Sequence, residues 1–254
     1  MFSPMSTGKF IDQLYSRKGG LMPGTVNMIC GEPGVGKTTV CLDILVSIQK
    51  NDPARSILYI PSEMNEYDLY EEAQDNPSLL EVPTLFTHPY IDHGLPQVIE
   101  KVFDQGHDVV LLDSFVDIME KCAEEMSWTI RRAELWLLNL MLSHAEKHRT
   151  CFLCIQQYNK TGNFVGSNKL KHNTTSFMFI LRDKSSLPYL LFHKNRRNGA
   201  AVHRPLYFSK DKETGQINYD DRRYEKEDNI REQAREENMR KAEEELDFEK
   251  LFAS

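Results

Sequence analysis

Short apolar runs alternate with amphipathic segments over most of the chain. The apolar runs of strand length lie at residues 25–30, 56–60, 108–113 and 150–156. Helical spacing follows at 37–49, at 65–105 (with a short strand near 84–87) and at 127–147, where Ser127 is the expected cap. Strands that alternate with helices form parallel sheets covered on both faces. The pattern therefore predicts an α/β fold with a mostly parallel central sheet and helices on both faces.

The pattern changes in the last third of the chain. Strand-like segments pair as 176–182 with 189–193 and as 202–208 with 216–219, which predicts C-terminal β-hairpins. From Asp220 onward apolar residues are scarce, and residues 220–254 hold 13 Asp and Glu against 8 Lys and Arg. We predict one domain over 1–219 and an acidic tail over 220–254, either disordered or in a solvated, marginal helix.

Composition excludes several classes of protein. The net charge is −7, and most of it lies in the tail, so the near-neutral body argues against a general basic coat for nucleic acid but not against one local basic loop. No apolar run reaches the ~20 residues that span a bilayer, and the N-terminal residues lack a signal-peptide pattern. We expect no membrane partner and a cytoplasmic location, in a bacterium or a phage-infected host.

The five cysteines show no disulfide pattern. Cys151 and Cys154 form a C-x-x-C within an apolar run that reads as a buried strand. Residues three apart on a strand point to opposite faces, so these two thiols can neither pair nor share a metal ion. We expect both to be core residues.

Residues 31–38 read GEPGVGKT, a complete phosphate-binding loop pattern placed between a predicted strand and a predicted helix. Glycines let the backbone N–H groups face a phosphate, and the helix N-terminus adds a partial positive charge. The lysine is expected at the β- and γ-phosphates and the threonine hydroxyl on Mg²⁺. A glycine-rich turn without function is the alternative. The predicted ATP-binding residues are Gly31, Glu32, Pro33, Gly34, Val35, Gly36, Lys37, Thr38 and Thr39.

Three polar positions follow strands, where open α/β sheets place their ligands. Asp113 has the form of the aspartate that, with Thr38, holds Mg²⁺; a turn residue is the alternative. Glu63 is placed to activate the water that attacks the γ-phosphate, or else is an acid that favours a helix N-terminus. Gln157, after Gln156, is a candidate sensor of the γ-phosphate.

The segment 159–172 combines glycines and lysines with one aromatic residue. Lys160, Lys169 and Lys171 could bind phosphates, and Phe164 could stack on a base, as single-stranded DNA requires. A solvated, lysine-bearing loop is the alternative. Lys121, in what reads as a loop after Asp113, is a further candidate contact.

The ordered motifs resemble the RecA-type ATPase core. They are Ser6-Thr7-Gly8, Pro23-Gly24, the phosphate-binding loop, Ser62-Glu63-Met64 and Leu112-Asp113-Ser114. Residues 157–166 and 170–172, followed by Lys194-Asn195-Arg196, are similar to the RadA (Sms) recombination helicases. Gln157 stands where RadA has His and resembles the Gln of DnaB-type helicases, and Arg197-Asn198-Gly199 after Lys194-Asn195-Arg196 is intermediate between the RadA and the DnaB-type motifs. The resemblance covers about residues 6–208. The zinc motif and the protease-like domain of RadA are not seen, which favours a shortened, phage-type version.

This resemblance implies a DNA-stimulated ATPase motor that acts as a helicase or branch-migration protein in replication, recombination or repair. It implies a homo-oligomeric ring, expected to be a hexamer, in which Lys194 and Arg196 face the γ-phosphate of the neighbouring subunit; two surface cations are the alternative. It also favours DNA contact by the 159–172 segment. An ATP-gated scaffold or regulatory ATPase of the KaiC type is the other function that fits.

The end of the tail places Leu246, Phe248, Leu251 and Phe252 among acidic residues. An acidic, aromatic tip resembles the tails by which some replication proteins recruit partners, with the aromatic side chains as anchors. A tip that packs against its own domain is the alternative. We expect a replisome or recombination protein to bind there.

Overall fold

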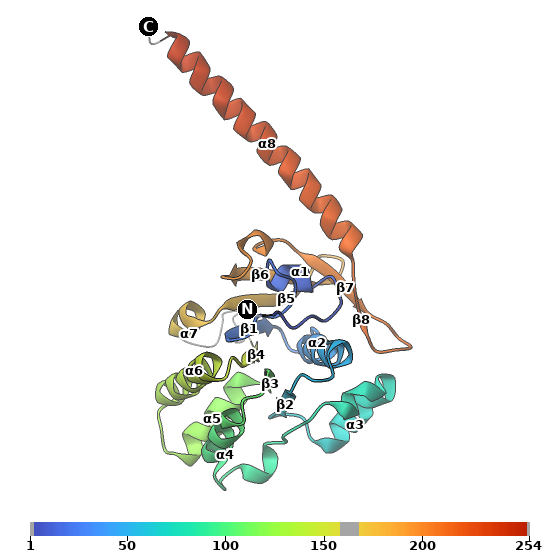
Figure 1. The fold of residues 1–254 in the computed structure, drawn as a ribbon, viewed down its shortest axis with the longest axis vertical. Helices are drawn as coiled ribbons and strands as arrows, with labels where there is room; N and C mark the ends of the chain where they lie inside the picture. Colours follow the sequence, from blue (N-terminus) through green and yellow to red (C-terminus); the bar gives the residue numbers. More distant parts are fainter. Residues whose placement is uncertain (1–2, 158–167, 253–254) are drawn as a thin grey trace.

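An eight-stranded sheet organises the computed structural model, which describes residues 3–157 and 168–252 (Figure 1). In spatial order the strands are β2 (Ile57–Pro61), β3 (Val109–Asp113), β4 (Cys151–Gln157), β1 (Thr25–Gly31), β5 (Ser176–Arg182), β6 (Pro188–Asn195), β7 (Leu206–Lys210) and β8 (Ile217–Tyr219). The first five are parallel, and the pairs β5–β6, β6–β7 and β7–β8 are antiparallel. The predicted α/β class, with a mostly parallel sheet and C-terminal hairpins, is confirmed.

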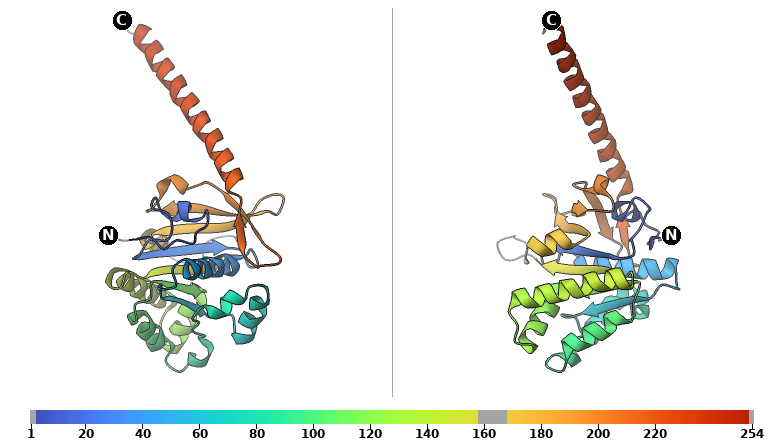
Figure 2. Two further views of the ribbon diagram at one scale, coloured as in Figure 1. Left: turned by 45° about the vertical axis from the view of Figure 1, so that its right-hand side comes forward. Right: turned by 60° about the vertical axis from the view of Figure 1, so that its left-hand side comes forward.

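Helices cover both faces of the parallel strands, as Figure 2 shows from two sides. Helices α2 (Lys37–Asn51) and α3 (Glu66–Asp75) pack on one face, and α4 (Leu95–Asp104), α5 (Phe115–Glu125) and α6 (Ile130–Lys147) on the other. Alternate residues of a strand lie in different cores. In β3, Val109 and Leu111 lie in the core on the side of α2, and Val110 and Leu112 lie in the core on the side of α4, α5 and α6. The sheet thus forms the middle layer of three.

The cysteine pair follows the same alternation along β4. Cys151 lies in the core under α2, Cys154 lies in the core under α6, and neither side chain is exposed. All five cysteines are free. The expectation that these two thiols fill the core on opposite faces is confirmed.

The region between β2 and β3 contains less helix than its spacing predicts. Between α3 and α4 lie two short 3₁₀ helices, η1 (Pro77–Glu81) and η2 (His88–Tyr90). Thr84 makes only an isolated parallel bridge to Tyr59, so the strand near 84–87 is not formed as a strand. Prolines at 77, 83 and 89 account for the difference, since each lacks the backbone N–H that a longer helix requires.

Two further boundaries differ from the sequence prediction. The segment after Asp113 is helix α5 rather than a loop, and Ser127, with φ of 53°, separates α5 from α6. The cap of α6 is instead Thr129, whose Oγ1 accepts a hydrogen bond from Arg132 N at 3.2 Å. Strand β7 begins at Leu206 rather than at residue 202, since Pro205 has no N–H for a ladder.

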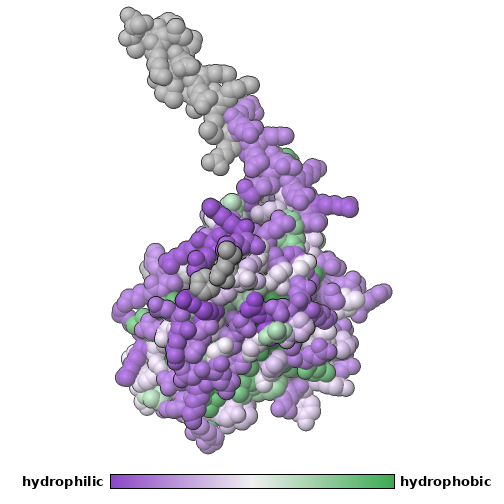
Figure 3. Space-filling model, in the orientation of Figure 1, coloured by the Kyte–Doolittle hydropathy of each residue, from purple (hydrophilic) through white to green (hydrophobic). Residues whose placement is uncertain are grey.

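The remaining helices lie around the C-terminal hairpins. They are α1 (Asp12–Tyr15), α7 (Asn168–Asn173), η3 (Gly199–Ala201) and α8 (Asp221–Phe252). Helix α8 projects away from the body, and the surface of its described part is mostly hydrophilic, with Ile230 as an exposed apolar residue (Figures 1 and 3). Among its described side chains, Asp228 pairs with Arg204 at 2.7 Å, Tyr224 contacts Phe10 with ring centroids 5.3 Å apart, and Arg231 donates to the His203 carbonyl at 3.2 Å. The tail is thus helical, and its described side chains are exposed or partly exposed, while its separation as a region of its own stays a prediction.

Candidate nucleotide-binding site

The phosphate-binding loop joins β1 to α2 at the carboxyl edge of the parallel strands. Gly36 immediately precedes α2 with φ of 100°, a conformation that L residues rarely adopt. At Gly31 a Cβ would lie 2.6 Å from the carbonyl oxygen of Ile180 on β5. Both glycines are therefore required by the backbone itself. The loop directs the start of a 15-residue helix, and its partial positive charge, toward the sheet edge.

Lys37 is buried inside this loop. Its ammonium donates to the carbonyl oxygens of Gly31 at 2.9 Å and Glu32 at 2.8 Å, and the residue is 7% exposed. Burial lowers the pKa of Lys37, and the negative charge of Asp113 acts in the opposite direction. Phosphate oxygens can replace the two carbonyls as acceptors and would supply the negative charge that the buried ammonium favours.

Thr38 and Asp113 meet although 75 residues separate them. Thr38 Oγ1 donates to Asp113 Oδ2 at 2.7 Å, and the Tyr59 hydroxyl donates to the same oxygen at 3.3 Å. Burial raises the pKa of Asp113, and the nearby Glu63 adds to this effect, while the Thr38 hydrogen bond opposes it. Hard oxygen donors of this kind are those that Mg²⁺ prefers, so the pair fits the predicted ion.

Glu63 reaches the same sheet edge through the pairing of β2 with β3. Ser62 N donates to the Asp113 carbonyl oxygen at 2.7 Å, and Ser114 N donates to Ser62 Oγ at 2.9 Å. Ser114 Oγ then donates to Glu63 Oε1 at 3.3 Å. These bonds hold the ends of both strands together, so Glu63, Asp113 and Lys37 belong to one site.

Sequence reasoning missed Tyr59 and the bracing role of Ser62. Tyr59 reads as a core residue of an apolar strand, and it is 1% exposed. Its hydroxyl nevertheless contacts Asp113, because β2 and β3 pair with Ile60 beside Leu112. Lys121 lies in helix α5, so its expected place in a loop is wrong, while its contact with DNA stays a prediction. Its ammonium donates to the Ser62 carbonyl at 2.7 Å and pairs with Asp117 at 2.5 Å.

The other predicted nucleotide contacts lie along the same loop. Val35 is buried, Thr39 is partly exposed, and Glu32, Pro33 and Gly34 are exposed. In the β1–β4 register Gln157 lies beside Gly31, so its backbone ends at the phosphate-binding loop. Its role as a sensor stays a prediction.

Lys194 and Arg196 bind the end of α7 within the same chain. The Lys194 ammonium donates to the carbonyl oxygens of Lys171 at 2.7 Å, His172 at 2.8 Å and Thr174 at 2.6 Å. Arg196 Nη2 donates to the His172 carbonyl as well. Cations at a helix C-terminus are favourable. The two residues therefore fix α7 against β6, and a role toward a neighbouring subunit stays a prediction.

The candidate DNA segment, 159–172, is described only in its last five residues, 168–172. Lys169 and Lys171 lie on α7 and are exposed, whereas Leu170 between them is fully buried. Lys160 and Phe164 lie outside the described residues. The structure thus shows two lysines on a short helix that is anchored to the core by a leucine and to β6 by Lys194.

Comparison with solved structures identifies the fold. A KaiC-like protein of Pyrococcus horikoshii superposes with a TM-score of 0.67 at 17% identity, over 86% of this chain and 99% of its own. The flagellar accessory protein FlaH of Methanocaldococcus jannaschii gives 0.63 at 12% identity, over 87% and 99%. This chain has the RecA-like P-loop fold.

Sequence comparison points to another branch of proteins with the RecA-like fold. The DNA repair protein RadA of Chlamydia muridarum is 23% identical over 162 residues, and that of Aquifex aeolicus is 24% identical over 158 residues. These alignments cover 64% and 61% of this chain, which spans about a third of each relative's length, 34% and 33%. No family model matches. In the described part of the chain, no helix is long and apolar enough to cross a bilayer.

Proposed function

We propose that this chain is an ATP-hydrolysing motor of the RecA-like type whose activity is stimulated by single-stranded DNA. The observation that carries the hydrolysis step is the convergence of Lys37, Thr38, Asp113 and Glu63 at one sheet edge, with Thr38 and Asp113 joined at 2.7 Å. Bound Mg²⁺, held by the Thr38 hydroxyl and through water by Asp113, would neutralise phosphate charge.

The residues of the site have separate tasks in this proposal. The loop backbone and Lys37 bind the phosphates, and Lys37 can leave its two carbonyl acceptors for phosphate oxygens without leaving the loop. Glu63, steadied by Ser114 Oγ, orients and deprotonates the attacking water. The similarity to RadA supports DNA as the stimulating ligand, and so do the exposed lysines of α7.

The route from DNA to the nucleotide runs through α7 and β6. DNA phosphates bound to Lys169 and Lys171 would displace α7. The C-terminal carbonyls of α7 accept hydrogen bonds from Lys194 and Arg196, so the displacement would reach these two cations. In a ring these two cations would also lie at the boundary between subunits and respond to the neighbour's γ-phosphate. Mixing Arg196→Ala with Lys37→Ala subunits should then restore part of the activity that each variant lacks, provided mixed rings form.

A second function has specific support. The two solved structures named above are a KaiC-like protein and a flagellar accessory protein, and each is covered over 99% of its length. They favour an ATP-gated scaffold whose nucleotide controls assembly with a protein partner. Such a protein needs the same phosphate site but no DNA.

The rate of ATP hydrolysis with and without single-stranded DNA separates the two functions. The motor predicts stimulation that is lost in Lys169→Ala/Lys171→Ala while basal hydrolysis survives, and a salt slope of DNA binding that falls by ~0.7 per lost phosphate contact. The matched control is Lys18→Ala/Lys101→Ala, which removes two exposed lysines that lie outside α7. A rate of ATP hydrolysis that single-stranded DNA does not change at any salt concentration would favour the scaffold.

A further inference from the structure

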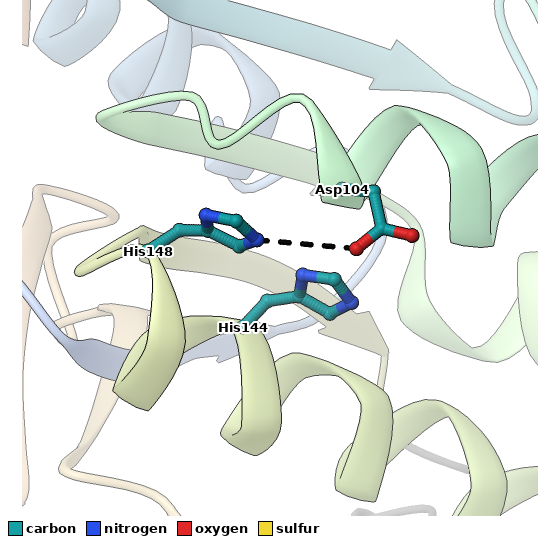
Figure 4. Close-up of side chains that lie close together, drawn as sticks. All are labelled: Asp104, His144 and His148. Carbon is teal, nitrogen blue, oxygen red and sulfur yellow. Dashed lines mark ion pairs between the residues drawn. The ribbon is translucent and has the colours of Figure 1, made fainter.

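A histidine pair and an aspartate converge where α4 and α6 end (Figure 4). His144 and His148 lie one turn apart at the end of α6, and Asp104 is the last residue of α4. One side-chain ligand atom from each of the three residues lies within 4.8 Å of the other two. The rings point toward the same carboxylate, and His148 Nε2 lies 3.9 Å from Asp104 Oδ1.

Two ring nitrogens of this cluster are buried without a hydrogen-bond partner. They are His144 Nδ1 and His148 Nε2, and His144 as a whole is only 6% exposed. A buried nitrogen without a partner is unfavourable unless something binds it.

We propose that Asp104, His144 and His148 form a Zn²⁺ site. Two imidazole nitrogens and one carboxylate oxygen, with water in the remaining position, are a ligand set that Zn²⁺ accepts. Mg²⁺ and Ca²⁺ prefer oxygen donors throughout, so the two imidazoles select against both.

The site lies at the opposite end of the parallel strands from the phosphate-binding loop. Asp104 precedes β3 and His148 precedes β4, so the cluster lies at the amino ends of the parallel strands. The phosphate-binding loop lies at their carboxyl ends. A metal ion here would join α4 to α6 without touching the nucleotide.

One of the two imidazole rings must rotate before both can bind the same ion. The two imidazole planes are nearly parallel, 13° apart, so one ring must turn before both can share an ion. His148, whose side chain is 23% exposed, is the ring that can turn. Gly106 makes room beside it, because a Cβ there would lie 3.1 Å from His148 Nδ1. Lys147 competes with the ion, since its ammonium contacts Asp104 Oδ1 at 3.1 Å.

The test is calorimetric titration of chelator-treated, nucleotide-free protein with Zn²⁺ alone. The wild-type protein should bind one ion, and Co²⁺ should give the visible absorption of a tetrahedral site. His144→Gln/His148→Gln should weaken binding by at least ~100-fold, beyond the effect of losing an outer-shell group. The matched control is His88→Gln/His172→Gln, which removes two exposed histidines and should bind as the wild type does.

Two surface variants keep the test decisive if the histidine variant does not fold. Asp104 and Lys147 are 59% and 61% exposed, so neither substitution threatens the core. Asp104→Asn should weaken Zn²⁺ binding, whereas Lys147→Gln should strengthen it because the competing ammonium is gone. Wild-type protein that takes up no Zn²⁺, or an affinity equal in wild type, Asp104→Asn and Lys147→Gln, would overturn the proposal.

Discussion

Replacing Asp113 by asparagine should separate the stability of the fold from its function. The substitution introduces an isosteric amide whose oxygen can still accept from Thr38 and Tyr59, which donate to the carboxylate at 2.7 and 3.3 Å. A neutral acceptor weakens each bond by about 1 kcal/mol relative to a carboxylate, about 2 kcal/mol for both. The pKa of Asp113 is raised despite these bonds, so burial of its charge and repulsion by Glu63 cost more than the bonds return.

We therefore expect the free energy of unfolding of Asp113→Asn to equal that of the wild type at neutral pH or to exceed it by ~1 kcal/mol. The assay is urea unfolding of the nucleotide-free protein. The sign of the pH dependence follows from the raised pKa: the folded state holds the proton above pH 3.8, so Asp113 destabilises the wild type increasingly as pH rises. Any gain in the variant should thus shrink as pH falls toward 3.8 and vanish below it.

The same variant should bind nucleotide less tightly in the presence of Mg²⁺, by ~10-fold or more, because the ion loses a charged partner. The control is Asp43→Asn, a buried carboxylate that does have a cationic partner, Lys9 at 2.6 Å, and that should lose stability. If Asp113→Asn costs more than about 1 kcal/mol and leaves Mg²⁺-dependent affinity unchanged, Asp113 is a structural residue and the reasoning is refuted.

Two further substitutions test contacts that hold the site in place. Lys9→Met removes the cation beside Asp43, which is 4% exposed, and should cost about 3 kcal/mol of unfolding free energy; Lys18→Met is the exposed control, and an equal cost in both would contradict the account. Lys194→Met removes three carbonyl contacts at the end of α7 and should cost ~1 kcal/mol, with faster amide exchange in α7; unchanged exchange there would show that the contacts do not hold the helix.

Much of the fold and of the site could be predicted because their signals are local. The phosphate-binding loop is contiguous, and its glycines are required by the backbone at Gly31 and Gly36. Asp113 and Glu63 could be placed because each follows an apolar strand, and parallel strands bring their carboxyl ends to one edge. The alternation of apolar residues along β4 likewise predicted the opposite faces of Cys151 and Cys154.

The features that could not be predicted depend on which distant residues become neighbours. The hydroxyl of Tyr59 contacts Asp113 only because β2 pairs with β3 in one particular register. Lys194 shows no local sign that its partners are the carbonyls of α7. Helical spacing predicted too much helix after α3, where prolines interrupt it. It also placed the start of α6 at Ser127, a residue of positive φ that separates α5 from α6. The His144 and His148 pair has helical spacing, but Asp104 joins it only through the packing of α4 on α6.

The rate of phosphate release by Glu63→Gln, measured beside its affinity for ATP, tests whether this site hydrolyses ATP with Glu63 as the base. We expect the wild-type protein to hydrolyse ATP and the variant to bind ATP as tightly but to turn it over ~10²-fold more slowly or worse, because the amide cannot accept the proton of the attacking water. Equal turnover by the two proteins, or no hydrolysis by the wild type at saturating ATP and Mg²⁺ with or without single-stranded DNA, would contradict this expectation.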